Sequence, residues 1–196
     1  MCCPAGDPPW RGAGECARDG AGCAADSSVL LGQTYPASTV VGFDDHDASI
    51  RTARTRAGDA GVADRVTFET ASAETFAGTG YDAVFIFDAL HDMGDPLAAL
   101  RHIRDVLAPE GVLVVVEPNA ADTVEGNLNL VGQIFYSAST FICTQHSRWQ
   151  SGEQAACLGA QAGQARLTAL AEQAGFRSVR RAAETPFNIV VLELRP

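Results

Sequence analysis

Lysine is absent from this sequence, so every basic residue is an arginine, and acidic residues outnumber them. The 196 residues contain 14 basic residues and 24 Asp and Glu, which gives a formal net charge of −10 at pH 7. Proteins that bind nucleic acid usually display clustered positive charge. The densest group here, Arg51, Arg54 and Arg56, fits the solvent-exposed face of a helix. We therefore expect no nucleic-acid partner.

Long apolar runs are missing as well. No stretch approaches the roughly 18 consecutive apolar residues that a membrane-spanning helix needs. The first residues also lack the basic region and the apolar core of a secretory signal. These absences predict no membrane partner and make the cytoplasm the expected location.

Six cysteines are present, but no two of them form a Cys-x-x-Cys pair. No histidines accompany them at the spacing of a zinc site, so no metal site is expected. A disulfide framework is equally unexpected, because the chain has enough apolar sequence to build a core without one. We interpret Cys143 and Cys157 as ordinary half-buried thiols.

The length suits one well-packed α/β domain and is short for two. Residues 1–26 are rich in Gly, Pro, Ala and Cys, with no run of β-branched residues and no apolar stripe at helical spacing. That composition is typical of irregular or disordered chain. We therefore expect an irregular segment over residues 1–26 and a single domain over residues 27–196.

A strand, a helix and a second strand between residues 81 and 118 form the clearest pattern. Residues 83–87 and 112–116 are unbroken apolar runs, which are typical of strands buried on both faces of a parallel sheet. Between them, apolar residues recur at helical spacing: Leu97, Leu100, Ile103, Val106 and Leu107. Such a unit is nearly always right-handed, which makes the strands parallel neighbours. Ligands of such sheets bind beyond the carboxyl ends of the strands.

The same kinds of pattern predict three more helices and four more strands. The helices are expected near residues 29–35, 50–57 and 165–175, and the strands at residues 39–43, 66–68, 176–180 and 187–194. Residues 119–160 form a long, distinctly apolar insertion with polar residues interleaved. Its length and position suit a lid over a substrate. The alternative, that it covers an open sheet edge or forms a dimer contact, is equally open.

Several of these segments, taken in order, resemble one known family. Phe87-Asp-Ala-Leu-His-Asp-Met93, followed by Leu107-Ala-Pro-Glu-Gly-Val-Leu-Val-Val-Val-Glu-Pro118, is similar to the later motifs of class I S-adenosylmethionine-dependent methyltransferases. Ser38-Thr-Val-Val-Gly-Phe-Asp44 resembles that family's second strand. Residues 167–176 and 187–194 resemble its last helix and closing hairpin. The resemblance covers roughly residues 28–196.

This resemblance implies a Rossmann-like, doubly wound, mostly parallel sheet with a C-terminal antiparallel hairpin. It also implies S-adenosyl-L-methionine as the cofactor and methyl transfer to a small-molecule acceptor. Similar proteins often carry a preceding helical domain that supplies dimer contacts, so a homodimer stays an open expectation.

The first strand and its Gly-x-Gly-x-Gly turn are where this sequence departs from the family. The nearest match, Asp19-Gly-Ala-Gly-Cys-Ala24, has no apolar strand in front of it. We therefore expect a sheet that is incomplete at its N-terminal edge. The strands at residues 39–43 and 83–87 would lie beside a gap, a poorly paired segment or each other.

That departure leaves an alternative function open. A truncated, catalytically weak or inactive methyltransferase fold would act as a binding or dimerisation module. A nicotinamide-dependent oxidoreductase is a third possibility, but it needs Gly-x-Gly-x-x-Gly after a first strand, which this sequence lacks.

Candidate cofactor residues follow three of the expected strands. The resemblance implies that Asp44, with Asp45 as the weaker candidate, holds the ribose hydroxyls; the alternative is that Asp44 only caps the next helix. Ser72 and Ala73 stand where the family contacts adenine, although the family usually has an acid there. Asp88 stands where the family lines the cofactor cleft, and its alternative is a turn acid bonded to its own loop.

His91 is the candidate catalytic residue. Its reference pKa of about 6.5 suits a general base near neutral pH. In related plant-type O-methyltransferases, the His of a similar His-Asp pair removes the proton of the substrate. The alternative is a structural histidine held by Asp92 or Asp95. Methyl transfer asks chiefly for positioning of the acceptor and exclusion of water, so activity does not depend on a base.

Overall fold

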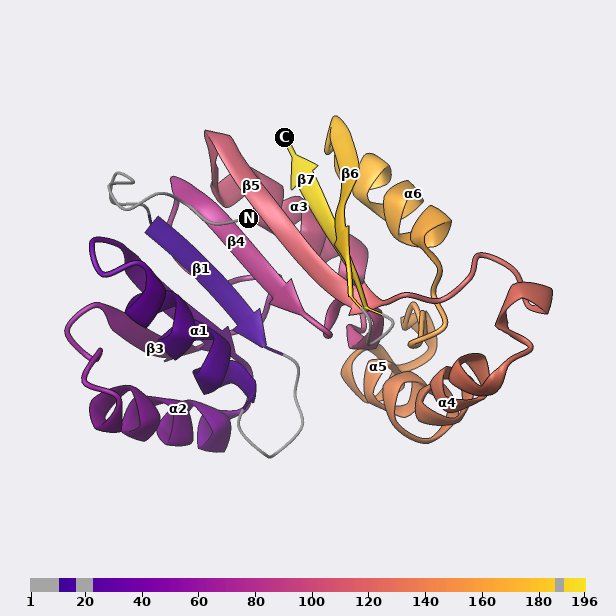
Figure 1. The fold of residues 1–196 in the computed structure, drawn as a ribbon, viewed down its shortest axis with the longest axis horizontal. Helices are drawn as coiled ribbons and strands as arrows, with labels where there is room; N and C mark the ends of the chain where they lie inside the picture. Colours follow the sequence, from indigo (N-terminus) through magenta and orange to yellow (C-terminus); the bar gives the residue numbers. More distant parts are fainter. Residues whose placement is uncertain (1–10, 17–22, 186–188) are drawn as a thin grey trace.

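The computed structural model describes residues 11–16, 23–185 and 189–196, which form a seven-stranded sheet flanked by helices (Figure 1). The strand order is β3-β2-β1-β4-β5-β7-β6, parallel from β3 to β5, with β7 antiparallel to both β5 and β6. The strands are β1 (Arg11–Cys16), β2 (Thr39–Asp44), β3 (Val66–Thr70), β4 (Tyr81–Phe87), β5 (Leu107–Pro118), β6 (Ser178–Glu184) and β7 (Ile189–Arg195). This topology confirms the predicted doubly wound sheet and its C-terminal hairpin.

Strand β1 corrects two predictions about the N-terminal segment. It lies in the middle of the sheet, in parallel register with β2 on one side and β4 on the other. Residues 1–26 are therefore not irregular throughout, and the sheet has no gap between β2 and β4. The segment is rich in glycine and has low intrinsic β propensity. Hydrogen bonds from two neighbouring strands override that weak local preference. The possible glycine turn at residues 19–22 lies outside the described residues.

Four helices flank the sheet where the chain crosses between strands. Helices α1 (Cys23–Thr34) and α2 (Asp47–Asp59) pack together beside β1, β2 and β3. Helices α3 (Pro96–Val106) and α6 (Gln164–Ala174) pack together near β5 and β6. The chain winds outward from β1 in one direction and from β4 in the other, so right-handed crossovers place the two helix pairs on opposite faces.

Two apolar clusters form the core. The larger lies between the sheet and the pair α3–α6, where Ile86 and Leu113 are fully buried. The smaller gathers Ile50, Ala53 and Ala57, from the helix predicted near residues 50–57, against β2 and β3. The prediction of strands buried on both faces holds only in part, because alternate residues of β4 and β5 are half-buried.

The insertion between β5 and α6 is helical. It contains the short turn η2 (Glu125–Asn127), then α4 (Leu130–Ala138), the π-helical turn η3 (Ser139–Cys143), α5 (Thr144–Ser151) and the turn η4 (Gly152–Gln154). Figure 1 shows this segment near the carboxyl ends of β4 and β5. In the described part of the chain, no helix has the length and apolar character required to cross a membrane.

Candidate active site

Asp44 marks one corner of the sheet's carboxyl edge. It is the last residue of β2, and its side chain is buried. Oδ1 accepts a hydrogen bond from the backbone N–H of His46 at 2.6 Å. Because His46 occupies the N-cap position of α2, this bond orders the turn before the helix. Asp45, the weaker candidate, is exposed.

The loop after β3 reaches the same corner. The backbone N–H of Ala71 donates to the carbonyl of Asp44 at 3.0 Å, which brings the two strand ends together. Ser72 is half-buried and pairs its hydroxyl with that of Thr75 at 3.0 Å, while Ala73 is buried in the core. Three of the predicted cofactor residues, Asp44, Ser72 and Ala73, therefore lie on neighbouring strand ends.

Asp88 directly follows β4 and has an uncommon backbone conformation. Its φ is +54°, in the left-handed region that aspartate tolerates better than most residues. The backbone N–H donates to the carbonyl of Val116 at 2.7 Å, which continues the pairing with β5. The side chain is exposed, and Oδ1 lies 4.0 Å from His91 Nδ1. Asp88 thus points its carboxylate at the sheet edge beside the histidine.

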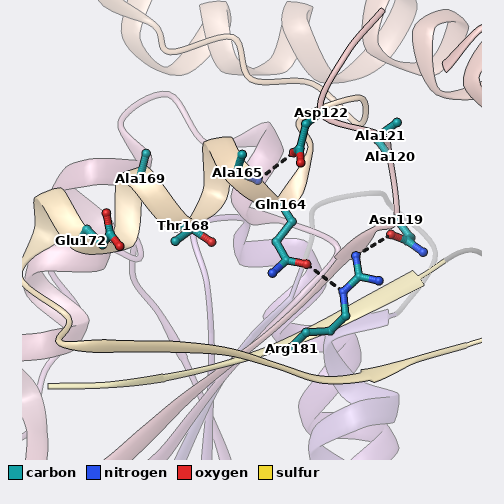
Figure 2. Close-up of a pocket in the computed structure, with 10 residues that line it drawn as sticks. All are labelled: Asn119, Ala120, Ala121, Asp122, Gln164, Ala165, Thr168, Ala169, Glu172 and Arg181. Carbon is teal, nitrogen blue, oxygen red and sulfur yellow. Dashed lines mark hydrogen bonds between the residues drawn. The ribbon is translucent and has the colours of Figure 1, made fainter. Parts of the chain in front are cut away.

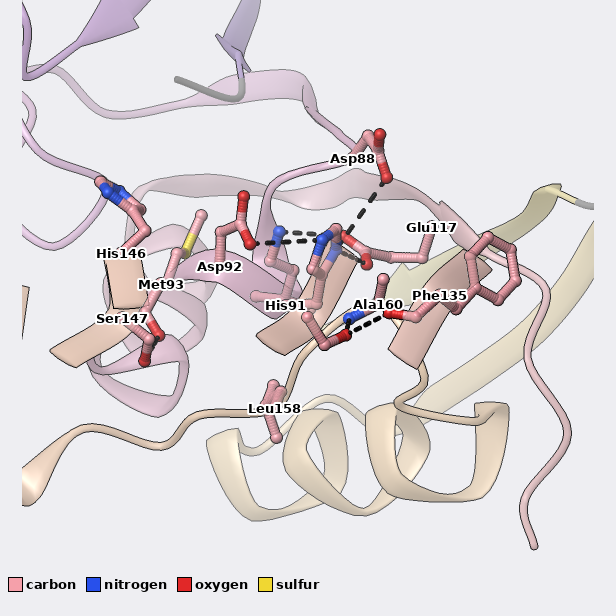
Figure 3. A network of polar contacts seen from close by, with 12 residues as sticks. Asp88, His91, Asp92, Met93, Glu117, Phe135, His146, Ser147, Leu158 and Ala160 are labelled. Carbon is pink, nitrogen blue, oxygen red and sulfur yellow. Dashed lines mark hydrogen bonds and ion pairs between the residues drawn. The ribbon is translucent and has the colours of Figure 1, made fainter. Parts of the chain in front are cut away.

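His91 is buried and is held by Glu117 (Figure 3). Nδ1 lies 2.6 Å from Glu117 Oε2, and the other oxygen of Glu117 accepts the backbone N–H of Leu90 at 2.9 Å. On the opposite side of the ring, Nε2 lies 3.3 Å from Asp92 Oδ1. Of the two predicted partners, Asp92 is therefore present. Asp95 is not, because it caps α3 by accepting the N–H of Ala98 at 2.9 Å.

Glu117 is the site residue that sequence reasoning missed. It stands near the end of β5, and the register of β4 with β5 pairs Phe87 with Val116, so the segment after β4 lies beside it. The signal was available in the sequence: an acid follows an apolar strand here as it does at Asp44.

These contacts change the pKa values of His91 and Asp92. Burial alone would lower the pKa of His91, but hydrogen bonds to Cys143 and Glu117 and the negative charges of Glu117 and Asp92 outweigh it and raise that pKa to about 11. Burial raises the pKa of Asp92, although the nearby charge of His91 opposes the shift. In this arrangement His91 carries a proton on both nitrogens at neutral pH.

Hydrogen bonds join the inserted segment to the loop at residues 91–94, which we call the histidine loop. The buried Ser147 hydroxyl donates to the carbonyl of Met93 at 2.9 Å and accepts the N–H of Cys157 at 3.1 Å. The N–H of Gly94 donates to Gln150 Oε1 at 2.6 Å, and the N–H of Gly159 donates to the carbonyl of His91 at 3.1 Å. The insertion thus forms one wall of the site.

The two described cysteines differ. Both are free thiols, but Cys143 is buried beside His91, whereas Cys157 is half-buried. Cys157 fits the expected ordinary thiol. Cys143 does not, because its sulfur, His91 and Asp92 place potential ligand atoms within 4.8 Å of one another.

A pocket of about 800 Å³ lies elsewhere, between the end of β5, α6 and β6 (Figure 2). Four of its polar side chains are engaged with one another or with the backbone: Arg181 donates to Gln164 Oε1 at 2.7 Å and to Asn119 Oδ1 at 3.1 Å, and Asp122 accepts the N–H of Ala165 at 2.7 Å. None of the predicted site residues lines it. We place the site at the carboxyl edge instead, because buried ionisable groups converge there.

Comparisons with known proteins support the fold. A family model described as a methyltransferase domain matches residues 20–175. The chain is 32% identical over 95 residues to the ubiquinone biosynthesis O-methyltransferase of Dinoroseobacter shibae (strain DSM 16493). The aligned stretch covers 48% of this chain and 36% of that protein. The chain therefore spans little more than a third of this curated relative.

Solved structures show the same fold. The S-adenosylmethionine-dependent methyltransferase SibL superposes with a TM-score of 0.68 at 21% identity, over 95% of this chain and 51% of that one. An O-methyltransferase family protein from Burkholderia thailandensis gives 0.70 at 15% identity, over 95% and 51%. The mitomycin 7-O-methyltransferase MmcR gives 0.66 at 19% identity, over 95% and 49%. This chain corresponds to about half of each of them.

Proposed function

Because the chain belongs to the methyltransferase domain family, we propose that it transfers a methyl group from S-adenosylmethionine to a small-molecule acceptor. The observation that carries the proposal is the convergence of Asp44, Asp88 and the His91–Glu117 pair on one edge of a sheet with this family's topology. The alternative, an inactive module, rested on a missing central strand and on a degenerate glycine turn. Strand β1 removes the first of these premises, and the turn lies outside the described residues.

The described residues fit the nucleoside end of the cofactor. A buried carboxylate at the end of β2 suits a pair of ribose hydroxyls, and Asp44 is such a group. Ser72 and Ala73, after the neighbouring strand β3, would contact the adenine. Asp88, after β4, would line the cleft that holds the cofactor. When bound, S-adenosylmethionine supplies an already activated methyl group.

The acceptor would bear a hydroxyl group, in keeping with the relatives named as O-methyltransferases. Glu117 holds Nδ1 of His91, which leaves Nε2, 3.3 Å from Asp92 Oδ1, as the nitrogen that can exchange a proton. We propose that Nε2 accepts the hydroxyl proton as the methyl group is transferred. His91 must lose the proton from Nε2 before it can do so, because the pKa of His91 is raised to about 11.

The inserted segment would enclose the acceptor. Its inner side is fixed to the histidine loop, and its outer side exposes large apolar side chains: Val124, Leu128, Leu130, Val131, Ile134, Phe141, Ile142 and Trp149. Such a surface suits a substrate lid or a contact between two copies of the chain. Both roles stay proposals.

Calorimetric titration with S-adenosylmethionine and S-adenosylhomocysteine tests this function without knowledge of the acceptor. We expect saturable binding of one equivalent at micromolar concentration. A folded chain that binds neither compound at millimolar concentration would support the inactive module instead. Methyl transfer is then measured as S-adenosylhomocysteine formed in the presence of hydroxylated aromatic compounds.

A further inference from the structure

The side chains of Asp92 and Cys143 meet the imidazole of His91 in one buried cluster. His91 and Asp92 come from the turn η1 (Leu90–Asp92), and Cys143 is the last residue of η3 in the insertion. Their potential ligand atoms, Nε2 or Nδ1, a carboxylate oxygen and Sγ, all lie within 4.8 Å of one another. Imidazole, carboxylate and thiolate are the three side-chain ligands that zinc uses in proteins.

One oxygen of this group faces the imidazole and the Cys143 thiol without a well-formed hydrogen bond. Asp92 Oδ1 is buried and has no hydrogen-bond partner among the residues whose side chains the structure describes, 25–185 and 189–196. Its neighbour His91 Nε2 lies 3.3 Å away. A buried carboxylate oxygen without a hydrogen bond is costly. A cation between these atoms would satisfy it.

The separation of these two atoms matches a shared metal ion. Zinc binds nitrogen and oxygen ligands at about 2.0–2.2 Å with tetrahedral angles, which places two such ligands about 3.3–3.5 Å apart. The observed separation of 3.3 Å between Nε2 and Oδ1 falls in this range. The thiol of Cys143 completes a set of three ligands and leaves a fourth position for water.

On the other side of its ring, His91 contacts a carboxylate, as histidines that ligate metals commonly do. A histidine that ligates a metal commonly donates its other N–H to a carboxylate, which fixes the ring and the tautomer. Glu117 Oε2 provides that carboxylate at 2.6 Å from Nδ1, and Glu117 is itself fixed by the N–H of Leu90. Nε2 is thereby left as the nitrogen that faces Asp92 and Cys143.

We propose that His91 Nε2, Asp92 Oδ1 and Cys143 Sγ bind a thiophilic divalent cation of the zinc class. Binding replaces the protons on Nε2 and on the thiol, which pass to solvent. The cation occupies the nitrogen that would accept the acceptor's proton, so it inhibits methyl transfer. This last consequence rests on the proposed function, whereas the metal site itself does not.

Cobalt is the probe for the site, because Co²⁺ takes zinc ligands and its thiolate complexes absorb in the near ultraviolet. The metal-free chain is titrated with Co²⁺ alone and then with Zn²⁺. We expect a thiolate-to-cobalt band that saturates at one equivalent and is abolished by Zn²⁺. Absence of a saturable band would overturn the proposal.

Matched variants assign the band to its ligands. Cys143→Ser should abolish it, whereas Cys157→Ser, and the joint replacement by serine of Cys2, Cys3, Cys16 and Cys23, should leave it. Glu117→Gln should weaken Zn²⁺ binding about 10–100-fold, as loss of the carboxylate behind a ligating histidine does. A band that survives Cys143→Ser would disprove the site.

Two controls keep the outcomes separate. If Cys143→Ser does not fold, as judged by circular dichroism, His91→Gln must shift the cobalt spectrum and lower the affinity instead. An unchanged spectrum in that variant contradicts the proposal. Metal binding by a chain that transfers no methyl group even when metal-free would count only against the proposed function, and cofactor binding with no metal site only against this inference.

Discussion

Asp44 and Glu117 are both buried carboxylates where a parallel strand ends, yet they serve different neighbours. Asp44, 3% exposed, accepts the backbone N–H of His46, two residues away. Glu117, 1% exposed, accepts the N–H of Leu90 and binds His91, 26 residues away. The first corner is built by a local turn, and the second is assembled from two strands and an insertion.

This difference separates two tasks along one sheet edge. A carboxylate fixed by its own turn is held ready for a ligand whichever way distant segments move. A carboxylate that clamps a histidine from another strand depends on the register of β4 with β5 and on the inserted wall. We therefore expect changes at Asp44 to affect cofactor binding, and changes at His91 or Glu117 to affect turnover and stability.

The largest effect should come from His91→Gln. If Nε2 accepts the proton of the acceptor, turnover should fall about 10²–10⁴-fold, while cofactor affinity barely changes. Steady-state kinetics and calorimetry on the same preparation separate the two quantities. His102→Gln, on α3, is the matched control and should keep its rate. A His91→Gln enzyme that keeps most of its rate would return His91 to a structural role.

Glu117→Ala should have the next largest effect, on folding. It leaves a buried imidazolium without its partner and the Leu90 N–H without its acceptor, so we expect a loss of about 3–5 kcal/mol in the free energy of unfolding. Urea denaturation measures it. Glu110→Ala, an exposed glutamate of the same strand, should change stability by less than about 0.5 kcal/mol. Equal losses in both variants would show that the buried contacts of Glu117 add no stability beyond those of an exposed glutamate.

Asp44→Ala should act on the cofactor. We expect binding of S-adenosylhomocysteine to weaken by about 1.5–3 kcal/mol, the range for a hydrogen bond to a charged group. Calorimetry with a folded variant is the measurement. Asp45→Ala tests the rival acid, which is exposed, and should have the smaller effect. The reverse order would move the ribose contact to Asp45.

The sequence predicted the parts of this molecule that local patterns encode. The inner face of α2, the helix α3 and the unbroken strands β4 and β5 follow from periodicity, because each buries a contiguous apolar set. Asp44 and His91 follow from their places after apolar strands. Strand β1 does not, because its glycine-rich sequence takes its conformation from hydrogen bonds to two distant strands.

The contacts of the histidine were beyond the reach of sequence patterns for the same reason. Glu117 meets His91 only through the pairing of two strands, and Cys143 meets it only because the insertion folds back over the loop. No fixed spacing in the sequence links residues 91, 92 and 143. From the sequence we expect no metal site, because no cysteines and histidines occur at the spacing of a zinc motif. The proposed cation site does not depend on such a motif, because its ligands are brought together by the fold.

Glu193, which is half-buried on β7, should give the smallest effect. Burial raises its pKa, but the hydrogen bonds and the charges of Arg180 and Arg195 together outweigh this and hold the pKa below its usual range. A carboxylate with a lowered folded-state pKa adds stability above its unfolded pKa of about 4.3 and loses it as the pH falls through the folded value. Because both arginines are about half exposed, the gain should stay below about 1 kcal/mol. Urea unfolding of the wild type and Glu193→Gln should therefore differ slightly at pH 6, and the two should converge only as the pH falls below about 4. A difference that grows as the pH falls would show that the arginines do not stabilise the carboxylate.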